Sequence, residues 1–327
     1  MSLRAVVFGG VVWALAAAGA VAADLRVAAW LTDADSAAAK LEAADFQATV
    51  NAADVPVQAA LGPGDPLIVI VVLDMVGDLN RIDAARGALA AYIQSMGDNA
   101  YVALLQAQDG LLTLQDPTQE REQLVEKLMA SSVSGFPGLL DSVEQVAGIG
   151  DSMLAQPGVR VAALYLTDGS IGAYRGNLVN TVVNPSDSGD LSRRFGSRLI
   201  QEKMSSLHSN LQQFSTPLFF VHLEERTNSQ DVAYQNGIMQ FATATGGQAW
   251  FARGLVDVEQ LVRGALARID AHYSLTLPLP ADLTGPAELR LTSDKGAVEH
   301  RAQLLIHSAS GGKKGKKSKQ KRKRGES

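Results

Sequence analysis

The sequence of 327 residues contains no cysteine. This absence excludes disulfide bonds, iron–sulfur clusters, a thiol nucleophile and a lipid-modified cysteine anchor. The chain also lacks the His-Glu-x-x-His, phosphate-loop, Gly-x-Ser-x-Gly and dinucleotide-binding glycine motifs of common enzyme classes. Its five histidines show no metal-ligand spacing. We therefore expect a protein that is not an enzyme and that carries no organic cofactor.

Residues 1–23 have the pattern of a secretory signal peptide. Arg4 supplies a positive charge, the segment from Ala5 to Ala18 is apolar, and small residues up to Ala23 suit cleavage. This pattern predicts a secreted or periplasmic protein. Export without cysteine fits a bacterial envelope better than a eukaryotic secretory route. The alternative is an uncleaved N-terminal anchor, because the apolar run is close to the length that spans a bilayer.

Charge is unevenly distributed along the chain. The net charge is −5. Nine of the 29 Lys and Arg residues lie close to the C-terminus, so the part of the chain that precedes them is acidic. Residues 310–327 offer almost no apolar side chain for burial and are predicted to be disordered. The nine cations are Lys313, Lys314, Lys316, Lys317, Lys319, Lys321, Arg322, Lys323 and Arg324.

A basic tail of this kind binds polyanions through counterion release. For an exported protein we expect anionic lipid head groups or anionic envelope polymers as partners, rather than nucleic acid. The tail also has no interleaved aromatic residues on which bases could stack. The alternative is a solubilising tail that has no dedicated partner.

The segment from Leu67 to Leu73 is wholly apolar and mostly β-branched. A run without polar alternation is typical of a strand that is buried on both faces, as in the middle of a parallel sheet. The run ends at Asp74, and Gly77 and Asp78 follow before a helical pattern begins. Because ligands bind beyond the carboxyl ends of strands in open α/β sheets, the segment after Leu73 is a candidate site.

Strand-like and helical segments alternate between residues 66 and 272. Further buried strands are predicted at Val159–Leu166 and Pro217–Leu223. Pro117 is suited to the first position of a helix, which predicts a helix over Thr118–Ala130. Alternation over this length predicts an α/β fold with a doubly wound, mostly parallel sheet.

The flanks of this region are β-prone and lie outside the alternation. In residues 24–62, Asp45–Val50 and Val55–Leu61 are expected to form a hairpin around a short polar turn. Residues 273–309 contain three strand-like segments, and the Gly62–Pro66 cluster marks a boundary. Because chain termini often lie close together, we expect the two flanks to pair as one small β module.

Taken in this order, the chain resembles a von Willebrand factor A domain, specifically the VWFA-related family described from acidobacteria. The resemblance covers residues 66–272 and depends on Thr167-Asp168-Gly169 at a strand end and on Ala242–Gln248. Leu41–Phe46 is similar to the strand that precedes the family's domain, and Ile269–Tyr273 to its exit into a terminal β module. The resemblance implies a Rossmann-like fold and a role in protein recognition.

In that family, recognition usually depends on a metal-ion-dependent adhesion site. A hard cation such as Mg²⁺ is held there by an Asp-x-Ser-x-Ser strand end, a threonine and a second aspartate, and one position stays open for a partner's carboxylate. On this resemblance, Asp74 and Asp168 match the two aspartates. Val76, Asp78 and Pro137 replace the two serines and the threonine, and Val76 and Pro137 have no ligand oxygen. The resemblance therefore implies a degenerate metal site.

Two interpretations of Asp74, Asp78 and Asp168 follow. Carboxylates that lie close together repel one another unless a cation, a base or water compensates their charge. They form either an altered site for Mg²⁺ or Ca²⁺, of which Ca²⁺ tolerates looser geometry, or a relic whose aspartates are solvated or paired with Arg81 or Arg175. Asp141 is expected to act on a helix dipole and His222 to be packed or hydrogen-bonded.

The sequence thus predicts a non-catalytic secreted or envelope domain for protein–protein interaction or scaffolding, with an unidentified protein partner. One alternative is an adhesion domain that depends on a divalent cation held by altered ligands. Another is a polyanion-binding envelope protein that acts through its Lys/Arg-rich tail.

Overall fold

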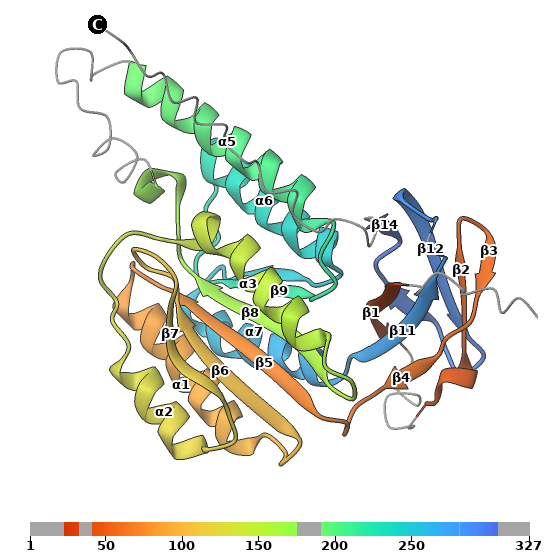
Figure 1. The fold of residues 1–327 in the computed structure, drawn as a ribbon. Coiled ribbons are helices and arrows are strands. Elements are labelled where there is room, and N and C mark those ends of the chain that lie inside the picture. The colour runs from red at the N-terminus through yellow and green to blue at the C-terminus, as the bar shows by residue number, and fades with distance from the viewer. Residues whose placement is uncertain (1–22, 33–40, 175–190, 281, 307–327) are drawn as a thin grey trace, which may run out of the picture.

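The computed structural model describes residues 23–32, 41–174, 191–280 and 282–306 (Figure 1). The predicted signal peptide and the basic tail lie almost entirely outside these ranges, and so does Arg175. Within the described ranges, no helix combines the length and the apolarity that crossing a membrane would require.

A six-stranded sheet forms the centre of the larger domain. Its strand order is β10-β9-β8-β5-β6-β7, and every neighbouring pair is parallel except the antiparallel pair of β6 and β7. The predicted doubly wound, mostly parallel sheet is confirmed. The strands are β5 (Leu67–Asp74), β6 (Ala100–Gln106), β7 (Leu112–Thr118), β8 (Arg160–Thr167), β9 (Leu218–His222) and β10 (Ala249–Phe251).

Helices cover both faces of this sheet, which explains why β5 shows no polar alternation. Val69 and Val71 point to one face, and Ile70 and Val72 point to the other, and all four are fully buried. One face is covered by α1 (Leu79–Ser95), α2 (Arg121–Ala130) and α7 (Leu255–Asp270). The other face is covered by α3 (Leu139–Leu154), α5 (Leu191–Leu211) and α6 (Ser229–Thr245).

The predicted helix over Thr118–Ala130 is wrong at its beginning. Pro117 and Thr118 belong to β7, and α2 begins only at Arg121. The strand tolerates a proline because β7 is the last strand of the sheet, where a missing N–H removes no ladder hydrogen bond on the open side.

The flanking segments form a second, smaller module of two antiparallel sheets (Figure 1). One sheet has the order β13-β1-β11-β4 and the other β14-β12-β2-β3, so each contains strands from both ends of the chain. Phe46, Leu275 and Leu289 belong to the apolar core of this module. Its strands are β1 (Ala23–Leu31), β2 (Phe46–Val50), β3 (Ala53–Val55), β4 (Ala59–Leu61), β11 (Tyr273–Leu279), β12 (Gly285–Ser293), β13 (Val298–His300) and β14 (Gln303–Ile306).

The predicted hairpin partner Val55–Leu61 is divided between the two sheets. β2 pairs with β3 across a two-residue turn in which Asn51 and Ala52 both have positive φ. Such a turn matches the twist of a hairpin. β4 instead pairs with β11, with Leu61 opposite Ser274. The chain therefore leaves one sheet after β3 and enters the other at β4.

Arg160 fixes both connections between the two parts of the molecule. It is fully buried at the start of β8. Its Nη1 donates to the carbonyls of Asp270 at 2.7 Å and His272 at 2.8 Å, and its Nη2 donates to the carbonyl of Asp65 at 3.0 Å. Asp65 precedes the larger domain and His272 follows it, so one guanidinium holds the chain where it enters and leaves that domain.

The strand β1 adds further contacts across the same junction. Trp30 packs within the core of the larger domain, and its Nε1 donates to the carbonyl of Arg268 at 2.8 Å. The Arg268 guanidinium lies 4.5 Å from the centre of the indole ring. Arg26 donates through Nη2 to the carbonyl of Val159 at 2.7 Å. Apolar packing and directed hydrogen bonds therefore both attach the small module to the sheet.

Candidate functional site

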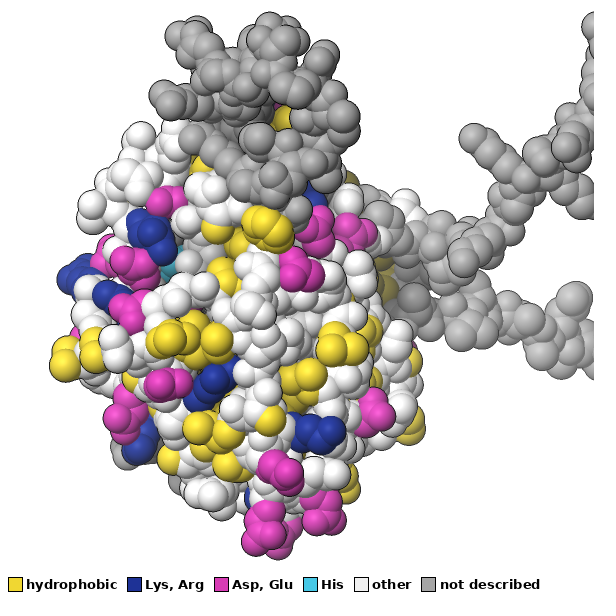
Figure 2. Space-filling model, turned by 90° about the vertical axis from the view of Figure 1, so that its left-hand side faces the viewer, with side chains coloured by type: hydrophobic (Ala, Val, Ile, Leu, Met, Phe, Trp, Pro, Cys, Tyr) yellow, Lys and Arg dark blue, Asp and Glu magenta, His cyan; other side chains and the backbone are white. Residues whose placement is uncertain are grey.

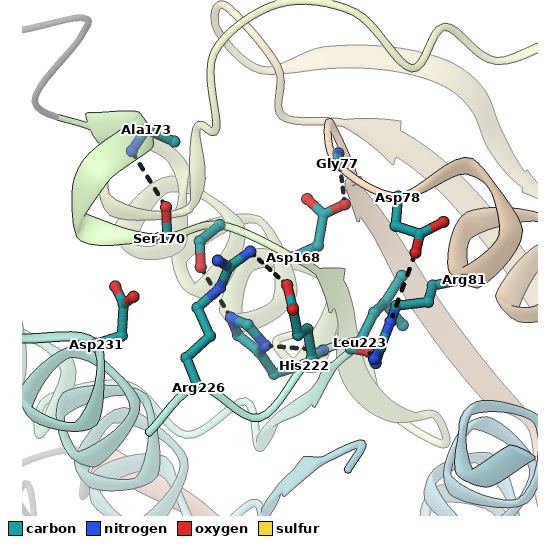
Figure 3. Close-up of polar contacts among 12 residues, drawn as sticks. Gly77, Asp78, Arg81, Asp168, Ser170, Ala173, His222, Leu223, Arg226 and Asp231 are labelled. Carbon is teal, nitrogen blue, oxygen red and sulfur yellow. Dashed lines mark hydrogen bonds and ion pairs between the residues drawn. The ribbon is translucent and has the colours of Figure 1, made fainter. Parts of the chain in front are cut away.

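The candidate site lies where the strand order of the central sheet reverses. β5 and β8 are neighbours, and Asp74 lies opposite Thr167 at their carboxyl ends. From β5 the chain continues to β6 on one side, and from β8 it continues to β9 on the other. Loops diverge at such a switch point and leave a crevice in which open α/β sheets bind their ligands. Asp168 follows Thr167 directly and lies at this switch point (Figure 3).

Asp74 is fully buried, and both of its carboxylate oxygens accept hydrogen bonds. Oδ1 accepts from the N–H of Gly138 at 2.7 Å, and Oδ2 accepts from the hydroxyl of Thr167 at 2.8 Å. Burial raises the pKa of Asp74 to about 6, although these two hydrogen bonds oppose the rise. The side chain therefore attaches the loop before α3 to the end of the central strand.

Asp168 is 6% exposed and holds the loop that follows β5. Its Oδ1 accepts from the N–H of Val76 at 2.8 Å, and its Oδ2 accepts from the N–H of Gly77 at 2.6 Å (Figure 3). Burial raises the pKa of Asp168, whereas these N–H groups and the nearby His222 and Arg226 lower it.

The third predicted residue, Asp78, has a different role. It is the N-cap of α1, and its Oδ1 accepts from the N–H of Asn80 at 2.8 Å. Its Oδ2 lies 3.9 Å from Nε of Arg81, and half of its side chain is exposed. Arg81 in turn donates to the carbonyl of Leu223. The structure therefore joins Asp74 and Asp168 at one site and turns Asp78 toward its own helix.

The donor set does not fit the octahedral Mg²⁺ site that the resemblance implies. Val76 and Pro137 contribute no side-chain oxygen, and all four carboxylate oxygens of Asp74 and Asp168 already accept protein hydrogen bonds. No group of three His, Asp or Glu side chains suited to a metal ion occurs in the part of the chain that the structure describes.

A third aspartate accepts a backbone hydrogen bond in the same way. Asp231, in the first turn of α6, is buried, and its Oδ1 accepts from the N–H of Ile171 at 3.0 Å. Asp74 and Asp168 thus each accept from the backbone of a neighbouring loop, and Asp231 accepts from the first residue of a short helix at 171–174. Hydrogen bonds between a carboxylate and backbone N–H groups are charge-assisted and strong, so these carboxylates give the segments a fixed shape.

Sequence reasoning identified His222 but missed Arg226. Nε2 of His222 donates to the carbonyl of Gly169 at 2.8 Å, and Nδ1 accepts from the N–H of Glu224 at 3.2 Å, which confirms the prediction that His222 is packed and hydrogen-bonded. Burial lowers the pKa of His222. Nη2 of Arg226 lies 2.5 Å from Glu224. The sequence could have identified Arg226 by its position, because it follows the end of a buried strand, β9, just as Asp74 lies at the end of β5.

Other expected residues have local roles. Asp141 lies in the first turn of α3, where a negative charge suits the helix dipole, and it pairs with Lys203. Arg81, one of the two bases considered for the carboxylates, pairs with Asp78 instead of Asp74 or Asp168.

The surface around the site combines charge pairs with exposed apolar side chains. Leu79 is 58% exposed at the start of α1, and Leu255 and Val256 are 46% and 87% exposed at the start of α7. Both helices begin at the carboxyl edge of the sheet, and α1 and α7 contact each other. Figure 2 shows hydrophobic side chains interspersed with acidic and basic ones on this side of the molecule.

No protein-family model matches the sequence, and no curated protein matches it. Solved structures with a similar fold include the vWF domain of the type V pili tip protein Mfa5 from Porphyromonas gingivalis, with 11% identity and a TM-score of 0.45 over 64% of this chain and 96% of that one. A von Willebrand factor type A structure from Catenulispora acidiphila has 12% identity and a TM-score of 0.43 over 89% of this chain and 74% of the other.

The PilB minor pilin from Streptococcus sanguinis has 14% identity and a TM-score of 0.45 over 63% of this chain. The chain spans 60% of the length of that pilin. The Porphyromonas gingivalis and Catenulispora acidiphila structures are von Willebrand A domains, which agrees with the predicted resemblance.

Proposed function

We propose that this chain is a non-catalytic protein-recognition domain of the bacterial envelope, whose binding surface is formed by the loops at the carboxyl edge of the central sheet. The observation that carries the proposal is the use of Asp74 and Asp168 as loop anchors. Both carboxylates are engaged by backbone N–H or hydroxyl donors. Their role is to hold a surface in shape, which recognition requires.

The exposed side chains above these anchors suit a protein partner. Leu79, Leu255 and Val256 offer apolar area at the first turns of α1 and α7. Charged residues of the same edge form ion pairs, as in Arg253 with Glu225 at 2.9 Å and Arg226 with Glu224 at 2.5 Å. A protein interface typically has an apolar centre and a polar rim, and both components are present here.

Recognition without a metal is the second part of the proposal. The positive charge beside Asp168 is supplied by Arg226, which contributes to lowering the pKa of that carboxyl. A guanidinium that belongs to the chain does not leave when chelators are added. Binding to the partner should therefore be insensitive to EDTA, unlike binding through a metal-ion-dependent adhesion site.

The envelope location is supported by the signal-peptide pattern of residues 1–23 and by the absence of cysteine. The pattern of residues 1–23 is compatible with a cleaved leader or with an N-terminal anchor. Fractionation of cells that express the full chain, followed by N-terminal sequencing, distinguishes the two.

The test is capture of partners from envelope extract with the full chain and its variants. A Leu255→Asp/Val256→Asp double variant should lose the captured protein, because two carboxylates would be buried in an apolar interface. Leu199→Asp is the matched control, since Leu199 is 51% exposed but belongs to α5. Equal capture by the double variant, or capture that requires a divalent cation, would contradict the proposal.

A further inference from the structure

A groove at the opposite edge of the central sheet is lined by residues of α5, α6 and the small β module. Figure 1 shows the ends of these two helices beside that module. The volume of the groove is about 820 Å³. Trp30, Met239, Pro286 and Leu304 contribute apolar lining, and Arg301 lies at its base. The groove is remote from Asp74 and Asp168, so what it binds is separate from the function proposed above.

Arg301 is a buried cation without a carboxylate partner. It is 8% exposed, and its Nη1 donates to the carbonyls of Ala244 at 2.6 Å, Phe214 at 2.8 Å and Gln212 at 3.4 Å. Among the described residues, its Nε and Nη2 have no hydrogen-bond partner and no acid lies within ion-pair distance. Two nitrogen atoms of the guanidinium, with three N–H groups between them, therefore remain for a ligand.

The other charged groups near this base do not neutralise it. Asp151 acts on Arg301 electrostatically, but its carboxylate accepts from the N–H groups of Ser215 and Thr216. Glu299 lines the groove but pairs with Arg268 at 2.5 Å. The three carbonyls accept from Nη1 but bring no counter-charge, and a buried charge that lacks one is costly. A carboxylate in the groove would reduce that cost through charge-assisted hydrogen bonds to Nε and Nη2.

The groove is also lined by two histidines, which are neutral or positive and therefore do not neutralise Arg301. His300 is positioned by the small module, because its Nε2 lies 3.1 Å from the N–H of Leu291, which donates to it. His208 lies on α5 near the end of that helix. The side chains that line the groove therefore favour an anionic occupant over a cationic one.

The edge strands that line the groove suit an extended chain. β10 is the last strand of the central sheet, and β13 and β14 are the last strands of the two small sheets. Ala249 of β10, Glu299 of β13 and Gln303 of β14 all line the groove. Edge strands present unpaired N–H and C=O groups, to which an extended peptide can add as a further strand.

We infer that this groove binds an extended, acidic polypeptide segment, with one of its carboxylates on Arg301 and its apolar side chains on the lining of the groove. The charge complementarity with Arg301 selects an acidic segment, and the flanking strand edges select an extended one.

The test uses the full chain and a fluorescent peptide of sequence Val-Thr-Val-Glu-Val-Thr-Val, with its Gln analogue as the neutral control. Arg301 also caps α5 and α6, so the variants are placed at Ala302. This residue lines the groove, has an exposed side chain, and takes part through its backbone carbonyl in a bond with the N–H of Leu289. Ala302→Glu places a competing carboxylate in the groove, and Ala302→Lys is the matched control.

We expect the Glu peptide to bind at least about tenfold more tightly than the Gln peptide, and Ala302→Glu to remove that difference. Ala302→Lys should keep it. The basic tail also attracts acidic peptides, so the measurement is made at about 0.3 M salt. Because the tail is identical in all variants, a difference between them reports on the groove.

Four results would overturn the inference. The Gln peptide could bind as tightly as the Glu peptide, or binding could be the same in Ala302→Glu as in the wild type. Displacement of the peptide by sodium acetate at equal concentration would show a site for small anions instead. Self-association that Ala302→Glu abolishes, seen by sedimentation without peptide, would show that a second copy of the chain occupies the groove.

Discussion

Gly77 donates its backbone N–H to Oδ2 of Asp168 at 2.6 Å, and a Cβ at position 77 would lie 2.7 Å from the same oxygen. The hydrogen bond brings the backbone of residue 77 so close to the carboxylate that only glycine, which has no Cβ, fits there without a clash. This contact connects the loop after β5 to the loop after β8, and it sets the shape of the candidate site.

The first prediction concerns this contact. Gly77→Ala should destabilise the protein by about 1–3 kcal/mol, because the added methyl group displaces Asp168 from the N–H groups of Val76 and Gly77. Gly87→Ala is the control: position 87 lies within α1, and no atom lies within 4 Å of a Cβ there. It should stabilise the protein by about 0.5–1 kcal/mol. Urea unfolding of both variants measures the contrast, and similar midpoints would refute it.

The second prediction concerns the pH dependence contributed by Asp74. Its pKa is raised to about 6 in the folded protein, so the native state binds the proton more tightly than the unfolded chain does. This contribution is present at acidic pH and is lost as pH rises through about 6. Asp74→Asn keeps an acceptor for Gly138 and carries no charge.

The variant should therefore gain stability relative to wild type between about pH 4 and 6, with a slope of at most about 1.4 kcal/mol per pH unit. Chemical unfolding at several pH values measures the difference. If the difference in stability between variant and wild type does not change with pH, burial does not raise the pKa of Asp74.

His272 should show the opposite dependence. It is buried, its Nδ1 donates to the carbonyl of Ile269 at 2.6 Å, and burial lowers its pKa to about 3. The folded protein therefore prefers the neutral ring, and the associated stability is present above about pH 6.5 and is lost as pH falls toward 3. NMR titration of the ring nitrogens should find His272 neutral at pH 5, where a solvent-exposed imidazole is charged. A charged ring at that pH would contradict the prediction.

The fourth prediction concerns divalent cations. Titration calorimetry of the full chain with Mg²⁺ or Ca²⁺ should show no binding that depends on Asp168, because both of its oxygens accept backbone hydrogen bonds. A cation at 100 times its Kd would stabilise the fold by about 2.7 kcal/mol, so thermal unfolding with and without EDTA gives an independent measure. A micromolar response that Asp168→Asn abolishes would support the altered cation site instead.

The junction between the two parts provides the fifth prediction. Arg160→Met should destabilise the protein by about 3 kcal/mol or more, because it leaves the carbonyls of Asp65, Asp270 and His272 without their donor. Arg263→Met is the control, since Arg263 forms an exposed pair with Glu259 on α7 and should change stability by at most about 0.5 kcal/mol. Calorimetry measures both variants. Equal Tm values would show that Arg160 does not hold the junction.

The order of the large elements could be predicted because it depends on local pattern. Leu67–Leu73 lacks polar alternation because helices cover both of its faces, and the same signal marks β8 and β9. The beginning of α2 was misjudged because Pro117 suits both the first position of a helix and an edge strand. The choice between these depends on where the strand lies in the sheet, which no local pattern records.

The candidate site was predictable only in part. The position of Asp74 at a strand end, and of Asp168 in Thr-Asp-Gly, located both residues correctly at the edge of the sheet. Asp78 lies four positions after Asp74, yet it caps α1, because an aspartate before a helix accepts from the helix's own N–H groups. Arg226 was missed because its proximity to Asp168 spans 58 positions of the chain.

The sequence by itself determined the layered α/β architecture, since apolar periodicity decides which segments can be buried and on how many faces. It also determined that carboxylates would meet at the carboxyl edge of the sheet. Only the tertiary structure decided what those carboxylates bind, and it pairs Asp74 with Gly138 and Asp168 with Val76 and Gly77. The physical reason is that a hydrogen bond depends on position within a few tenths of an ångström, and packing between distant segments sets that position.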